Sequence, residues 1–319
     1  MTGAAGFIGS HLVEALLGAN QTVVGLDNLS TGKGENAKRL LASGDGRFTL
    51  IEGDIRSLDA CRNACRGCDY VLHQAAQVSV PASMNDPTAT RDINVTGFLN
   101  VLTAAREHQV RRVVYASSCA VYGDSERLPL KEDEPPRPLS PYAESKLANE
   151  TDAASFSRTH GCETVGLRYF NIFGPRQDPK GVYAAVIPAW ATAMIQGTPV
   201  EIFGDGSTTR DFCYIANVVQ ANLLAATVEL EGASHAVVNV AAGARTSLNE
   251  LFALLRTMLL SDHPHLADFK PAHQDFRPGD IRHSHADIAK ARRLLGYVPS
   301  HTVEQGLREA LAWYRSSAA

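Results

Sequence analysis

Residues 1–17 read MTGAAGFIGSHLVEALL and place Gly3, Gly6 and Gly9 at three-residue intervals, directly before a run that is apolar at helical spacing. Glycines at a turn into a helix let backbone amides approach a pyrophosphate closely, and the amino end of the helix favours its negative charge. A triplet of this kind is weak evidence by itself. It indicates a dinucleotide-binding turn when a suitable strand follows.

The next apolar stretch supplies that strand. Residues 22–27 read TVVGLD, and Asp27 stands 18 residues after Gly9. An acid at the end of this strand suits the ribose 2′-hydroxyl of NAD and repels the 2′-phosphate of NADP. The sequence therefore predicts a dinucleotide site that takes NAD.

The start of the chain departs from the usual order. A glycine loop of this type follows a buried strand, whereas only Met1 and Thr2 precede Gly3. That strand is normally central in the sheet. We therefore expect it to be absent, which would leave two neighbouring strands without a hydrogen-bonding partner.

Strand and helix patterns alternate through the first half of the chain. Strand patterns lie at residues 48–55, 70–76, 113–118 and 164–170, and helical patterns lie at residues 92–108 and from Pro141 onwards. Such alternation predicts an α/β fold with a doubly wound parallel sheet of the Rossmann type. Polar or small residues follow two of these strands, at Asp54 and at Ala75-Ala76. They could contact adenine and admit the cofactor closely.

The pattern loosens after residue 172. Pro and Gly become more frequent, and the remaining elements are a strand near 237–241 and helices near 247–260 and 303–314. We expect an NAD-binding domain at residues 1–171. A smaller, partly interleaved substrate-binding lobe would occupy residues 172–319.

The composition excludes several classes of protein. The 319 residues are 45% hydrophobic and 20% charged with a net charge of −4, which is ordinary for a globular chain and unlike a nucleic-acid-binding surface. No apolar run approaches the ~20 residues that span a bilayer, and no signal-peptide pattern opens the chain. The six cysteines lack the spacing of a zinc site. We expect a cytoplasmic protein with buried, reduced thiols and no metal.

The stretch SPYAESK at residues 140–146 carries the reactive groups. Tyr142 and Lys146 are four residues apart, so both lie on one face of a helix. An ammonium near a phenol favours the phenolate, and we therefore expect the pKa of Tyr142 to fall from ~10 towards neutrality. Tyr142 could then take a proton from a sugar hydroxyl. The alternative is that Tyr142 and Lys146 are surface residues without a catalytic role. The upstream Ser117-Ser118 and the glycine loop both argue against this alternative.

With these motifs in register, the chain resembles the extended short-chain dehydrogenase/reductases. It is most similar to the 4-epimerases that act on UDP-hexoses and UDP-N-acetylhexosamines, in particular the UDP-N-acetylglucosamine 4-epimerases. The resemblance implies that Tyr142 is the base, that Lys146 holds the nicotinamide ribose, and that Ser118 binds the reacting hydroxyl. It implies bound NAD as cofactor. The residues expected to bind it are Gly3, Gly6, Phe7, Ile8, Gly9, Asp27, Asn28, Asp54, Ile55, Gln74, Ala75, Ala76, Tyr142 and Lys146.

The resemblance extends to the second lobe. It implies that Asn171, Arg210 and Arg277 grip the substrate diphosphate and that Asp280 contacts the uridine ribose. Two arginine forks are well suited to a doubly charged diphosphate. At Ser284 a large aromatic residue would restrict the pocket to plain hexoses, so the small serine implies room for an N-acetyl group.

The implied reaction is reversible inversion at C4 of UDP-N-acetylglucosamine or UDP-N-acetylgalactosamine through a 4-keto sugar, with UDP-glucose and UDP-galactose as further candidate substrates. Cys119 and Ala120 stand where the related dehydratases carry an Asp-Glu pair, which disfavours dehydration. The resemblance also implies a homodimer formed by the helices near 92–108 and 142–158. Two alternatives stay open. One is another NAD-dependent nucleotide-sugar epimerase, reductase or decarboxylase, and the other is a non-catalytic dinucleotide-binding protein.

Overall fold

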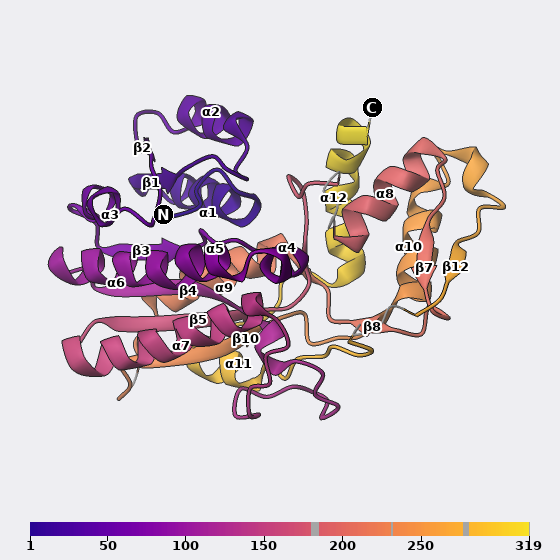
Figure 1. The fold of residues 1–319 in the computed structure, drawn as a ribbon. Helices are drawn as coiled ribbons and strands as arrows, with labels where there is room; N and C mark the ends of the chain where they lie inside the picture. The colour runs from indigo at the N-terminus through magenta and orange to yellow at the C-terminus, as the bar shows by residue number, and fades with distance from the viewer. Residues whose placement is uncertain (180–184, 231, 277–280, 319) are drawn as a thin grey trace.

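The computed structural model describes residues 1–179, 185–230, 232–276 and 281–318. Its centre is a parallel sheet between two layers of helices (Figure 1). The strands are β1 (Val23–Asp27), β2 (Phe48–Glu52), β3 (Tyr70–His73), β4 (Arg112–Ser118), β5 (Glu163–Tyr169) and β10 (His235–Val240). This arrangement confirms the predicted Rossmann-type fold.

Each face of the sheet has its own helices. One layer contains α3 (Leu58–Cys65), α6 (Gly97–Glu107) and α7 (Pro141–His160). The other contains α1 (Phe7–Gly18), α2 (Gly34–Ser43), α9 (Ile215–Thr227) and α11 (Ala289–Leu295). The parallel strands point the same way, so the residues that follow them meet along one edge of the sheet.

Thr2 closes the expected gap in the sheet between β1 and β3. Thr2 forms parallel bridges with Leu26 on one side and His73 on the other. Its N–H donates to Leu72 O (3.1 Å), and its carbonyl accepts from Gln74 N–H (3.2 Å). Backbone groups of β1 and β3 that would otherwise lie buried without partners are thus paired. Among the described residues, no strand element lies between β1 and β3, but through Thr2 the sheet is continuous from β2 to β10.

The rest of the chain forms a second group of elements beside the sheet (Figure 1). It contains three helices, α8 (Val186–Gln196), α10 (Leu248–Leu259) and α12 (Val303–Ala318), and short paired strands. The strand pairs are β6 (Ile172–Phe173) with β9 (Cys213–Tyr214), β7 (Glu201–Phe203) with β12 (Ala272–Gln274), and β8 (Thr209–Arg210) with β11 (Thr246–Ser247).

The two parts share one core. A single buried cluster runs from Val114 and Leu167 in the sheet to Trp190 and Leu255 in the second group. The chain also returns to the sheet, since β10 pairs with β5. A boundary near residue 171 stays a prediction. In the described part of the chain, no helix is both long and apolar enough to cross a membrane.

Candidate active site

The start of α7 places the predicted base. Ser140 caps the helix, its hydroxyl accepting Ala143 N–H at 3.2 Å, and Pro141 occupies the first turn. Both residue types favour a helix start at these positions. The N–H of Tyr142 donates to Ser83 Oγ (3.1 Å) of the neighbouring helix α4 (Val80–Asn85). Tyr142 is therefore anchored from both its own helix and the adjacent one.

The three predicted catalytic residues come together at the ends of β4 and α7. The hydroxyl of Ser118 lies close enough to the phenol of Tyr142 to lower its pKa. The ammonium of Lys146 lies 5.9 Å from the centre of the Tyr142 ring and donates to Ala116 O at 2.9 Å. Lys146 is only 2% exposed. The arrangement brings a half-buried proton-transfer group, a buried hydroxyl and a buried cation into one site.

The expectation that Lys146 lowers the pKa of Tyr142 is wrong for the side chains of the protein alone. Burial raises the pKa of Tyr142 to about 12, and the nearby Ser118 hydroxyl opposes that rise only in part. Burial also lowers the pKa of Lys146 to about 8. Loss of solvation outweighs a cation that is directed at a backbone carbonyl.

The glycine loop fits a diphosphate. Gly3 has φ +67°, and a Cβ at this position would lie 2.8 Å from Ala75 N. A Cβ at Gly9 would overlap the carbonyl oxygen of Gly3. Helix α1 begins at Phe7 with Gly6 as its cap, without a side-chain hydrogen bond and without an acid in the first turn. Its first N–H groups are therefore well placed for an anion.

Asp27 lies directly beside this loop. Its two carboxylate oxygens accept Ala5 N–H (2.9 Å) and Leu29 N–H (2.8 Å), and the residue is 8% exposed. Each oxygen retains a lone pair. The carboxylate is thus held in place with capacity for a ribose hydroxyl.

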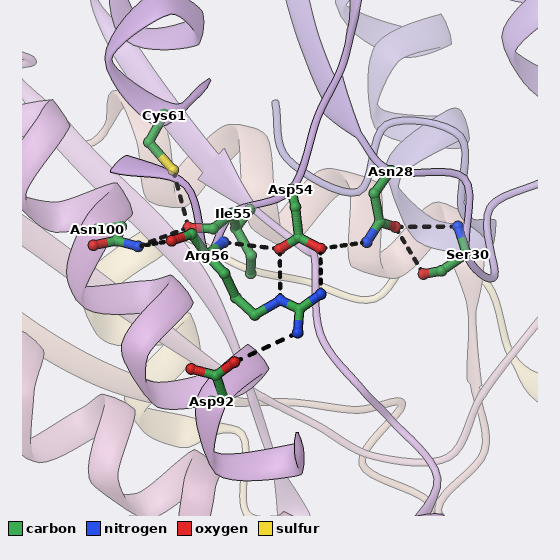
Figure 2. A network of polar contacts seen from close by, with 8 residues as sticks. All are labelled: Asn28, Ser30, Asp54, Ile55, Arg56, Cys61, Asp92 and Asn100. Atoms are coloured by element: carbon green, nitrogen blue, oxygen red, sulfur yellow. Dashed lines mark hydrogen bonds and ion pairs between the residues drawn. The ribbon is translucent and has the colours of Figure 1, made fainter. Parts of the chain in front are cut away.

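Figure 2 shows the polar network at the ends of β1 and β2. Asn28 Nδ2 donates to Asp54 Oδ2 at 2.8 Å, so the two predicted cofactor segments do meet. Arg56 binds the same carboxylate through Nε (3.0 Å) and Nη2 (2.9 Å) and holds the pKa of Asp54 well below its usual range. The carbonyl of Ile55 accepts from Cys61 Sγ and Asn100 Nδ2. An adenine contact by Asp54 or Ile55 stays a prediction.

The end of β3 is held from the other side of the site. Gln74 accepts from Tyr169 Oη (3.2 Å) and donates to Asn222 Oδ1 (3.1 Å). The N–H of Ala75 donates to Thr2 Oγ1 at 3.2 Å, and Ala76 follows directly. Ala75 thus lies beside the glycine loop, and close approach of the cofactor to the small residues stays a prediction.

The sequence analysis did not identify Asn94, which links the segment after β3 to α7. Asn94 lies in a π-helical turn, Asp92–Thr96, and is 1% exposed. Its side chain accepts Gln77 N–H (2.8 Å) and donates to Gln77 O (2.9 Å) and Ser145 Oγ (2.9 Å). A buried asparagine within an apolar helical pattern was the available signal.

Asn171 and Arg210 approach the catalytic group. Asn171, with φ +30°, donates from Nδ2 to Asp211 O (3.2 Å), and its backbone lies close enough to the Cys119 thiol to lower the pKa of that thiol. Arg210 donates to Thr209 O at 3.0 Å, and its charge lies close enough to lower the pKa of that thiol. Burial nevertheless raises the pKa of Cys119 to about 11. Asn171 and Arg210 therefore flank the residue next to Ser118.

Ser284 lies beside the strand of Arg210. Its N–H donates to Thr209 O at 3.1 Å, and the residue is 7% exposed. Among the described residues, its hydroxyl has no hydrogen-bond partner. The predicted diphosphate and ribose contacts Arg277 and Asp280 lie outside the described residues.

The NAD dependent epimerase/dehydratase family matches residues 1–241. The chain belongs to this family. A putative UDP-glucose 4-epimerase of Methanocaldococcus jannaschii is 37% identical over 99% of this chain and 98% of its own length. The family membership confirms the resemblance found in the motifs and the NAD cofactor predicted from the glycine loop and Asp27.

Solved structures agree in fold over the full length. A UDP-N-acetylglucosamine 4-epimerase from Methanobrevibacter ruminantium, in complex with UDP-N-acetylmuramic acid, is 38% identical with a TM-score of 0.91, covering 99% of this chain and 97% of that one. A Thermus thermophilus UDP-glucose 4-epimerase in complex with NAD is 34% identical with a TM-score of 0.85, covering 99% and 98%. The similar proteins thus include both plain-hexose and acetylated-hexose epimerases.

Proposed function

We propose that this protein is an NAD-dependent UDP-sugar 4-epimerase that interconverts UDP-N-acetylglucosamine and UDP-N-acetylgalactosamine, and that it also accepts UDP-glucose and UDP-galactose. The observation that carries the proposal is the grouping of Ser118, Tyr142 and Lys146 at the ends of β4 and α7, with Asn171 and Arg210 beside it. The group combines proton transfer with a site for a diphosphate. A non-catalytic dinucleotide-binding protein has no need of it.

The residues of the chain divide the work as follows. NAD, when bound, supplies a hydride acceptor and donor at C4 of the sugar and a positively charged ring. A positive charge in this buried site stabilises the phenolate of Tyr142. Tyr142 then removes the proton of the C4 hydroxyl and later returns it, while Ser118 orients that hydroxyl. Lys146 adds positive charge from its fixed position on Ala116 O.

Arg210 and Asn171 hold the nucleotide end while the sugar turns. A guanidinium suits a diphosphate through charge-assisted hydrogen bonds. The grip must survive rotation of the hexose between its two faces. Binding energy from the remote nucleotide thereby supports chemistry at C4.

Ser284 supports the acetylated substrates. It is small and buried, and its hydroxyl has no partner among the described residues, so a hydrogen-bond donor remains for an N-acetyl carbonyl. Ser284→Tyr should lower turnover of the acetylated pair while sparing UDP-glucose, because the ring would fill the space beside C2. Equal losses on both kinds of substrate would contradict this assignment.

The decisive experiment follows the sugar C1 proton by NMR. The protein is incubated with NAD and either UDP-N-acetylglucosamine or UDP-glucose, with Tyr142→Phe as the control. The galacto epimer should form without net NADH or CO2, and faster from the acetylated sugar. Release of NADH or CO2 would point to a reductase or decarboxylase. Activity retained in Tyr142→Phe would refute the role of the phenol.

We also propose a cytoplasmic homodimer. The resemblance implies contact through α6 and α7, and Leu99 on α6 is 40% exposed, so its replacement tests this helix as the contact. Sedimentation should give twice the mass of the chain, and Leu99→Glu should shift it towards the monomer.

A further inference from the structure

One face of α7 carries a row of three polar residues. Tyr142, Lys146 and Glu150 follow at four-residue spacing, so their Cα atoms rise about 6 Å per step along one side of the helix. Each contacts β4. Tyr142 meets Ser118, Lys146 donates to Ala116 O, and Glu150 Oε1 accepts from Ser117 Oγ at 2.6 Å. The row that contains the proposed base therefore ends in a buried carboxylate.

Arg168 holds that carboxylate from the next strand. It lies on β5 directly opposite Ser117 in the strand register. Its Nε binds Glu150 Oε1 at 2.8 Å and its Nη2 binds Oε2 at 2.7 Å, with both side chains less than 10% exposed. The guanidinium also donates to Glu132 O (3.3 Å) and lies 4.7 Å from the centre of the Tyr122 ring. A two-pronged contact of this kind restricts the position of both partners.

The same two strands carry a second ion pair at their other end. Arg112 on β4 and Glu163 on β5 are register partners joined at 2.6 Å, and Arg112 is 2% exposed. The remaining bonds of Arg112 go to Ala225 O and Val228 O, at the end of α9. This pair joins the strands to α9, whereas Glu150 and Arg168 join them to α7. Glu163 is 35% exposed and Glu150 8%, so this pair provides a comparison on the same two strands with a more exposed carboxylate.

We infer that Glu150 and Arg168 are positioning residues, whose ion pair sets the register of α7 on β4 and thereby the place of Tyr142 relative to Ser118. The inference rests on the proposed function. A helix moves largely as a unit, so a shift at Glu150 reaches Tyr142 two turns away. Misplacing a reacting group by about 1 Å can lower a rate about 100-fold.

The experiment compares Glu150→Gln with Glu163→Gln in the NAD-loaded enzyme. Both variants leave an arginine without its full partner, so both should lower Tm. Glu150→Gln should lower kcat by about 10- to 100-fold while KM for the UDP-sugar changes less than about 3-fold. Glu163→Gln should leave kcat within about 2-fold, because its site is remote from the base. The inference would be overturned if kcat fell in proportion to Tm in both variants alike.

A double variant separates position from stability. Glu150→Leu with Arg168→Met removes both buried charges, which often preserves or restores stability. The inference expects Tm to recover while kcat stays low. Recovery of kcat together with Tm would show a purely structural role and overturn it.

Crystal structures of the NAD-bound variants give a readout without turnover. In Glu150→Gln, α7 should shift along β4 and lengthen the Tyr142–Ser118 contact, while in Glu163→Gln it should not. An unmoved α7 would overturn the inference. If the parent protein epimerises no UDP-sugar, the proposed function fails, and the position of α7 in these crystals still decides the present point.

Discussion

Removal of the Ser118 hydroxyl should shift the pH dependence of the reaction in a direction that the structure specifies. With a pKa of about 12, only about one Tyr142 in 100,000 is ionised at pH 7. Half-ionisation at pH 7 would require about 7 kcal/mol of added stabilisation of the phenolate. The nearby Ser118 hydroxyl, as a hydrogen-bond donor to the phenolate, is one contribution from the chain itself.

The size of its effect follows from the charge of the acceptor. A hydrogen bond to a charged group is worth about 1.5–3 kcal/mol, which corresponds to a change of about 1–2 in the pKa. Ser118→Ala should therefore move the rising limb of kcat/KM against pH upwards by about that amount. At a fixed pH below the limb, the rate should fall about tenfold for each pH unit by which the midpoint rises.

The assay is a pH series of initial epimerisation rates with the parent protein, Ser118→Ala and Ser155→Ala. Ser155 lies on the exposed side of α7, so its replacement should leave the limb in place. The midpoint of the limb is the decisive quantity, because lost contact between Ser118 and substrate lowers the plateau without moving the midpoint. An unshifted midpoint in Ser118→Ala would refute the assigned role of this hydrogen bond.

Two further predictions concern stability. Gly9→Ala should lower the free energy of unfolding by about 1–3 kcal/mol or more, because its methyl group would overlap Gly3 O. The control Gly18→Ala meets no atom within 4 Å and should be neutral or stabilising in urea titrations. Equal effects of the two substitutions would contradict the tight loop. Burial lowers the pKa of His73 to about 3, so the folded state keeps it neutral while the unfolded state takes up a proton below about pH 6.5. The free energy of unfolding should therefore decrease as the pH is lowered, by about 2–3 kcal/mol from this residue at pH 4.5. The decrease should be smaller in His73→Gln.

Local spacing was enough to predict much of the fold and the site. The glycine triplet, the strand that ends in Asp27 and the alternation of elements indicated the Rossmann sheet, because period and turn chemistry are properties of short segments. The four-residue step from Tyr142 to Lys146 likewise placed both on one face of α7. These features depend on residues that are close in the chain.

Only the tertiary structure decided how these parts act on one another. The place of Thr2 between β1 and β3, the link from Asn94 to α7, and the pairing of Glu150 with Arg168 join segments that are distant in sequence. The pKa of Tyr142 rises because the packed fold removes water around the phenol, and no local motif reports that burial. The sequence by itself determined which groups are present and on which elements, while their solvation and their distances across the site follow from packing of the whole chain.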